Sequence, residues 1–421
     1  LAARGTMTAP LKTIPLVAGV MLRRSVRSCE NPDGGASSTA PSPPRRITAL
    51  DEWRGTIMVL MAIDHASYFI ARTHSREFWG TSLPDYAAAL PFVLRAASHI
   101  CAPGFFLLMG AGMAMLAEAR RASGWSSARL RRFFLLRGLI LIAAQLVIEN
   151  PAWGLAFVRG VPGSFVSRGG PIPGSGEGLA IYLGVLFALG AAMLFWSLAI
   201  RLPTVAVAGI SLAALVATAW ATPGPAAFGV DYPAWVRVLQ IPGRSGFIVG
   251  FYPVIPWLGI TGLGILLGRR VRSRPEDLSA QALVAAGVLL AGFVILRGLG
   301  GFGNFHPAPA GWIGFLNVTK YPPSLTFVLL TLGVNALLLG LYSRWGGQGL
   351  AWLAVFGRTP FFFYVVHLYL YGLMGWIVPA GVSQVKMLFF WLAGLVLLYP
   401  LCRGYGRFKT IRPAASIWRF F

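Results

Sequence analysis

The hydrophobic positions of this chain form long unbroken runs rather than an alternating pattern. About ten runs are close to 20 residues long, and polar, glycine-rich or proline-rich stretches separate them. They cover roughly residues 53–73, 87–117, 133–150, 178–200, 203–222, 247–268, 279–297, 324–343, 351–376 and 384–402. An α-helix of about 20 apolar residues crosses a hydrocarbon core of about 30 Å. The pattern predicts an all-α, polytopic integral membrane protein with about ten transmembrane helices. Pro91, Pro103 and Pro360 indicate kinks in the second and ninth runs.

The arginines between these runs are distributed unevenly. One alternate set of connections carries most of the arginines, whereas the other set carries only the scattered basic residues Arg76, Arg159, Arg168, Arg237, Arg244 and Lys320. The rich set includes Arg45 and Arg46, Arg120 to Arg132, Arg201, Arg269 to Arg274, Arg344, and Arg403 to Arg412. Cytoplasmic loops of membrane proteins carry an excess of Lys and Arg. The asymmetry therefore predicts an even number of spans, with the N and C termini both cytoplasmic.

Composition supports a membrane protein over a soluble one. Only 12% of the 421 residues are charged, about half the usual share for a soluble domain. The formal net charge of +23 is typical of nucleic-acid binding proteins, but here the basic residues lie in short loops between apolar runs. We therefore expect no nucleic-acid partner. The three cysteines have no metal-ligand spacing, and no metal is expected.

The chain divides into three parts. Residues 1–44 are rich in Pro, Ser, Ala and Arg, and their apolar run at 14–22 is too short to span a bilayer. We interpret them as a disordered cytoplasmic tail, with Met7 or Met21 as alternative start sites. Residues 45–405 form the transmembrane domain, and 406–421 a basic cytoplasmic tail.

Two glycine motifs have structural rather than functional interpretations. Gly298, Gly300 and Gly303 spell GxGxxG, but no strand–turn–helix pattern surrounds them, so they do not predict dinucleotide binding. Gly264 and Gly268 are spaced as in GxxxG, which indicates close helix packing. The outer connections 151–177, 223–246 and 298–323 are long, as functional loops often are.

Ionisable side chains inside the predicted spans are few, and such residues are functional candidates because burying them in lipid is costly. The predicted helix directions bring one set to a similar depth in the outer half of the membrane. This outer set is Asp64, His65, Arg95, His99, Glu149 and His367. Imidazole beside carboxylates suits general-base chemistry near neutral pH. His74 and His306, in outer loops, are interpreted as surface histidines.

A second set lies near the cytoplasmic face and consists of Asp51, Arg54, Arg137 and Arg358. Arginines there are suited to bind the phosphates of a cytoplasmic ligand. The alternative is that Asp51 and Arg54, three residues apart on one helix, only pair with each other.

Several stretches resemble the heparan-alpha-glucosaminide N-acetyltransferase catalytic-domain family, in particular bacterial members of unassigned substrate. They are RRITALDEWRGTIMVLMAIDHASYF, LRAASHICAPGFFLLMGAGMAM, FYPVIPWLGITGLGILLG, KYPPSLTFVLLTLG and FGRTPFFFYVVHLYLYG. The first stretch also resembles the opening helix of membrane acyltransferase family 3. The resemblance implies transfer of an acyl group from cytoplasmic acyl-CoA to a sugar across the membrane, by an intramembrane histidine without a metal. His65 takes the place of the family 3 histidine, whereas the essential histidine of the lysosomal enzyme lies closer to His74.

These observations lead to one main hypothesis. We expect a multi-pass acyltransferase of the bacterial inner membrane that acetylates the O or N of an envelope glycan or glycolipid, with acetyl-CoA or another acyl-CoA as donor. His65 acts as base, Asp64 or Glu149 orients it, and Arg95 and His99 stabilise the oxyanion. A covalent acyl-histidine, a solute or proton-coupled transporter, and a non-catalytic scaffold are the alternatives. Association as a homodimer is left open.

Overall fold

The computed structural model describes residues 47–156, 172–175, 178–346 and 350–413, together with Ser416 and Trp418. These residues belong to one compact unit, Ile47–Phe421. The predicted tail 1–44 lies outside the described residues, as does most of the outer connection 151–177.

Each predicted apolar run is helical over most of its length, which confirms the all-α fold class. The helices are α1 (Thr48–Ala66), α2 (Ala89–His99), α3 (Cys101–Ala122), α4 (Ser127–Ala144), α5 (Asn150–Gly154), α6 (Val185–Ala199), α7 (Thr204–Ala221), α9 (Val254–Ser273), α10 (Leu278–Leu299), α12 (Leu325–Trp345), α13 (Leu353–Arg358), α14 (Pro360–Ile377) and α15 (Gln384–Ile411). The second and ninth runs are each divided in two, and Pro103 and Pro360 lie in the first turns of α3 and α14. Proline is accommodated there because the first N–H groups of a helix have no partner within it.

Eight helical segments of the described chain are long and apolar enough to cross a membrane. The remaining two predicted spans are α1, which carries four charged residues, and α6, which has 15 residues. Helix α15 continues to Ile411, beyond the predicted end of the last span at 402. The count of ten spans therefore stays a prediction.

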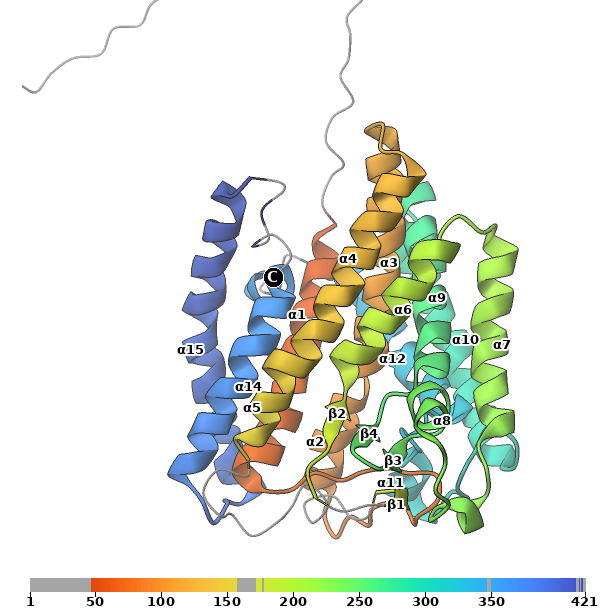
Figure 1. The fold of residues 1–421 in the computed structure, drawn as a ribbon, viewed down its shortest axis with the longest axis vertical. Coiled ribbons are helices and arrows are strands. Elements are labelled where there is room, and N and C mark those ends of the chain that lie inside the picture. Colours follow the sequence, from red (N-terminus) through yellow and green to blue (C-terminus); the bar gives the residue numbers. More distant parts are fainter. Residues whose placement is uncertain are drawn as a thin grey trace, which may run out of the picture. The chain divides into compact units, whose positions relative to one another are not determined.

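Small elements gather at one end of the helices (Figure 1). They are α8 (Ala234–Leu239), α11 (Gly311–Leu316), and strands β1 (Gly174–Ser175), β2 (Ile181–Leu183), β3 (Gly243–Ser245) and β4 (Ile248–Gly250). The strands form a sheet in the order β1-β3-β4-β2, in which only the β3–β4 pair is antiparallel. The arginine-rich turns lie at the opposite end, with the start of α1 and the end of α15 (Figure 1). The loops thus alternate as the arginine pattern predicted; which end faces the cytoplasm stays a prediction.

Backbone-to-backbone contact through glycine holds two helix pairs together. Gly264 and Gly268 of α9 lie directly against the backbone carbonyls of Leu107 and Ala111 in α3, which confirms their predicted packing role. On α13, Gly357 lies in the same way against the carbonyl of Asp51 in α1. A Cβ atom at these glycines would overlap main-chain atoms, so the helices approach as closely as they do because no side chain intervenes.

Hydrogen bonds of the Arg297 and His306 side chains hold the outer connection 300–320 in place. The Arg297 guanidinium donates hydrogen bonds to the carbonyl oxygens of Phe315, His306, Gly314 and Asn317 and to the side-chain oxygen of Asn304. The His306 ring bridges the Thr81 carbonyl, 2.6 Å from Nε2, and the Thr319 hydroxyl, 2.8 Å from Nδ1. The interpretation of His306 as a surface histidine is therefore wrong: it joins two outer connections.

The α3–α9 contact predicts that Gly264→Ala destabilises the protein. The new methyl group meets the Leu107 backbone, which can only move together with its helix, so we expect a loss of about 1–3 kcal/mol. Thermal unfolding of the purified protein in detergent measures the effect. Gly287→Ala is the matched control, because Gly287 is an exposed glycine inside α10 whose added Cβ meets no atom. Equal melting temperatures for the two variants would contradict the packing role.

Candidate active site

The candidate site begins at the C-terminal end of α1, where Asp64 and His65 lie in its last turn. The helix continues as one π-helical turn, η1 (Ser67–Ala71), and Arg72 then adopts a left-handed conformation with φ 61°. The Arg72 guanidinium donates a hydrogen bond to the Gly375 carbonyl of α14. This turn reverses the chain, so the 72–88 loop returns to the residues that end α1. π-Helical turns often mark functional sites.

His65 is buried and pairs with His367 of α14. The two rings stack with centroids 4.9 Å apart, and His65 Nδ1 lies 2.6 Å from His367 Nε2. His367 Nδ1 lies 2.9 Å from the Phe363 carbonyl, which only accepts, so this nitrogen carries the proton. In two neutral rings, His367 Nε2 is then the acceptor and His65 Nδ1 the donor. The lone pair of His65 is thereby placed on Nε2, and no described residue hydrogen-bonds to that atom.

Groups from α2 and from the 72–88 loop surround the Asp64 carboxylate. Its carboxylate accepts a 2.7 Å hydrogen bond from Arg95 NH1 and one of 3.2 Å from the Ser98 hydroxyl, both on α2. His74 Nε2, from the 72–88 loop, lies 3.4 Å from the other carboxylate oxygen. Asp64 therefore contacts His74 directly, whereas the hydrogen-bond partner of His65 is His367.

Glu77, also in the 72–88 loop, is a buried carboxylate that the sequence analysis did not single out. It accepts two hydrogen bonds from Arg95, 2.8 Å from Nε and 2.7 Å from NH2, and lies 3.4 Å from His99 Nε2. Burial raises the pKa of Glu77, but the Arg95 guanidinium outweighs burial and holds that pKa well below its usual range. The sequence indicates Glu77 only indirectly, because an arginine within a membrane span, here Arg95, requires carboxylate partners.

His74 is not a surface residue, so that interpretation is wrong. Its side chain is only 13% exposed, and it packs edge-on against the Tyr68 ring. Burial lowers the pKa of His74 to about 3, although nearby Asp64 acts in the opposite direction. His74 is therefore neutral at physiological pH, with Nδ1 3.1 Å from the Ser75 carbonyl.

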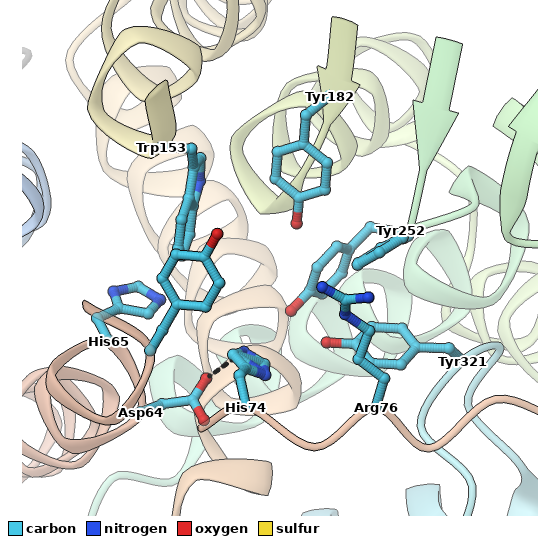
Figure 2. Close-up of a pocket in the computed structure, with 10 residues that line it drawn as sticks. Asp64, His65, His74, Arg76, Trp153, Tyr182, Tyr252 and Tyr321 are labelled. Atoms are coloured by element: carbon cyan, nitrogen blue, oxygen red, sulfur yellow. Dashed lines mark ion pairs between the residues drawn. The ribbon is translucent and has the colours of Figure 1, made fainter. Parts of the chain in front are cut away.

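Two small pockets meet at Asp64 and His65. Figure 2 shows the first pocket, with Asp64, His65 and His74 on one side and Arg76, Tyr252 and Tyr321 on the other. The hydroxyl groups of Tyr182, Tyr252 and Tyr321 point into it (Figure 2). The polar residues of the second pocket are Asp64, His65, Ser98, Tyr252, Lys320 and Tyr364. Each pocket holds about 40 Å³ of free space, which is room for roughly three water-sized groups.

A comparison with protein-family models identifies the family of the chain. The model for the catalytic part of heparan-alpha-glucosaminide N-acetyltransferase matches residues 46–296, more than half of the chain. The chain belongs to this family. Membership implies a transmembrane acetyltransferase-type function, of the acetyl-CoA-dependent type, in a multi-pass membrane protein. No curated protein matches the chain. The matched region of this acetyltransferase family member contains Asp64, His65, His74 and Arg95, whereas His367 lies beyond it.

The remaining outer candidates of this acetyltransferase family member surround the pockets. Glu149 is 1% exposed and accepts a 3.0 Å hydrogen bond from the Trp153 indole N–H. Trp153 in turn packs edge-on against His65, with ring centroids 5.1 Å apart. His99 contacts Glu77 and packs against Phe327. Among the described residues that line the two pockets, neither Glu149 nor His99 appears, so both reach the site through a neighbour.

At the other end of α1, three of the four predicted inner residues meet. Asp51 Oδ1 lies 3.4 Å from Arg54 NH1, and Asp51 Oδ2 lies 3.3 Å from Arg358 Nε. Arg54 NH1 also donates a 3.0 Å hydrogen bond to the Gly357 carbonyl. The structure thus contains the predicted Asp51–Arg54 pair and adds Arg358 to it. Arg137 lies on α4, with its guanidinium over the Phe133 ring of the same helix.

Replacing Glu77 tests whether the buried ion pair holds the site. In Glu77→Gln the Arg95 guanidinium loses its bidentate carboxylate while remaining buried, so we expect a loss of roughly 3–5 kcal/mol of stability. Asp85→Asn, an exposed carboxylate in the same loop, is the control and leaves the melting temperature unchanged. If both variants melt like the wild type, the pair contributes nothing to stability.

Proposed function

We propose that this protein transfers an acetyl group from cytoplasmic acetyl-CoA to a hydroxyl or amine of a sugar or glycolipid at the outer side, with His65 as general base. The observation that carries the proposal is the His367–His65 pair. Because the Phe363 carbonyl sets the His367 tautomer, the lone pair of His65 is on Nε2 of a ring that lines both pockets. An imidazole held in one tautomer by its other nitrogen is the arrangement that general-base catalysis requires.

In the proposed reaction, His65 Nε2 removes the proton from the acceptor hydroxyl or amine as that atom attacks the thioester carbonyl carbon. A tetrahedral intermediate forms, and its oxygen carries the negative charge. When it collapses, the C–S bond breaks and the thiolate of CoA leaves. The imidazolium of His65 then protonates the thiolate, which restores the neutral ring and releases the acetylated acceptor and free CoA.

In this proposal, the residue that orients His65 is neither Asp64 nor Glu149. Asp64 contacts His74, and Glu149 contacts Trp153, so His367 takes the orienting role for His65. The Asp64–His74 contact makes His74 the second candidate for the base. His74 is less suited, because its two ring nitrogens already face Ser75 and Asp64 rather than an open space.

Pocket size supports acetyl as the transferred group. The free space in each pocket is about 40 Å³, which is enough for the three heavy atoms of an acetyl group. The Asp51–Arg54–Arg358 cluster lies at the opposite end of α1, where its guanidinium groups can bind the phosphates of the donor.

Substituting the two pocket histidines tests the base. We expect His65→Ala to lower kcat for acetyl-CoA-dependent modification of envelope extracts by about 10²-fold or more, while acetyl-CoA binding is retained. Radiolabel transfer and donor binding, measured on the same purified protein, separate these effects. The comparison variant is His74→Ala, because His74 lines the same pocket. His306→Ala is unsuitable, because it removes hydrogen bonds that hold an outer loop in place. Full loss in His74→Ala with normal turnover in His65→Ala would assign the base to His74.

The inner cluster predicts a different kinetic effect. Arg358→Ala removes a hydrogen-bond donor to the CoA phosphates. Because these phosphates are bound equally in the ground state and the transition state, we expect the KM for acetyl-CoA to rise by roughly 10-fold or more while kcat changes little. Arg344→Ala, an exposed arginine in the last turn of α12, is the control. A fall in kcat with unchanged KM would contradict phosphate binding by Arg358.

A further inference from the structure

Lys320 is a buried cation at the proposed reaction centre. It is 3% exposed and lines the second pocket together with His65 and Asp64. Its backbone N–H donates to the Glu77 carbonyl at 3.1 Å, and its ammonium lies 5.2 Å from the centroid of the Tyr321 ring. The lysine is therefore held at the pocket by the same 72–88 loop that supplies Glu77 and His74.

None of the described residues neutralises the charge of Lys320 by direct contact. Within the described part of the chain, no carboxylate oxygen lies within 4.0 Å of its ammonium group. The two nearby carboxylates are engaged elsewhere, since Asp64 and Glu77 both pair with Arg95. A buried cation without a paired anion is costly, so its retention beside a pocket suggests that an anion forms or binds there.

The residues first expected to stabilise the oxyanion are already engaged. Arg95 donates three hydrogen bonds to the two carboxylates, and His99 faces Glu77. Neither of them is among the described residues that line the second pocket. The cation that shares this pocket with the proposed base is Lys320.

We propose that Lys320 is the oxyanion-binding residue of the transfer reaction, an inference that rests on the proposed function. As the acceptor attacks the thioester, the C=O bond becomes a C–O⁻ single bond, and the Lys320 ammonium donates a hydrogen bond to that oxygen. When the C–S bond breaks, the C=O bond reforms and the lysine keeps its proton. The ammonium thus stabilises charge that exists only in the transition state and the intermediate, which is the most effective use of a fixed positive group.

Replacing the lysine by an uncharged side chain of similar length tests this role. In Lys320→Met we expect kcat to fall by about 10²–10³-fold, with the KM for acetyl-CoA and for the acceptor nearly unchanged. Lys320→Arg retains a cation and should recover part of the lost kcat. Lys386→Met removes an exposed lysine at the start of α15 and should leave turnover unchanged. Retained acetyl-CoA binding shows that each variant is folded.

The outcomes separate the two proposals. A normal kcat in Lys320→Met, or a higher KM for the acceptor with normal kcat, would overturn the oxyanion role while leaving the transfer reaction intact. Equal loss in the Met and Arg variants would also overturn it, because a structural role does not depend on the charge. If the wild-type protein itself transfers no acetyl group, the proposed function fails, and the role of Lys320 fails with it.

Discussion

The Arg95 guanidinium lies between two carboxylates, Asp64 of α1 and Glu77 of the 72–88 loop, and the outer site depends on this arrangement. Through these ion pairs, Asp64 holds α1 against α2, and Glu77 holds the 72–88 loop against α2. Glu77 is also the attachment point for the connection that precedes α12, because its backbone carbonyl accepts hydrogen bonds from the N–H groups of Lys320 and Tyr321. In a medium of low dielectric constant, separating one of these charges from its partners is expensive. The network therefore fixes the positions of His74 and Lys320 relative to His65.

A second constraint is the length of α1. Asp51 and Arg54 lie at one end of this helix and His65 at the other, 11 residues past Arg54, or about 16 Å further along the axis. The proposed phosphate-binding groups and the proposed base are therefore separated by about half of a bilayer. This separation suits a donor whose thioester is carried on a long arm away from its phosphates, which is the chemistry of acyl-CoA. The glycine contacts of α13 keep Arg358 close to Asp51 at the inner end.

Many residues of the candidate site could be selected from the sequence as candidates, but their contacts with one another could not. The helix directions placed His65 and His367 at similar depth, and the structure brings their rings into contact. The same argument placed Asp64 near His65 as its orienting group, yet Asp64 contacts Arg95 and His74 instead. Depth along a helix follows from counting residues, whereas the direction of a side chain around the helix axis depends on which neighbours it packs against.

Apolar run length and arginine distribution determined, by themselves, the all-α fold, the approximate positions of the spans and the alternation of the loops, because the bilayer acts on each segment separately. The GxxxG contact was also predictable, since it depends on spacing within one helix. Only the tertiary structure decided the contacts of Glu77, His74 and Lys320. They lie in connections between helices, where the sequence carries no periodic signal, and they became buried because the 72–88 loop turns back onto α2 and the connection before α12 packs against that loop. Such contacts join residues up to about 250 positions apart, and no local pattern specifies them.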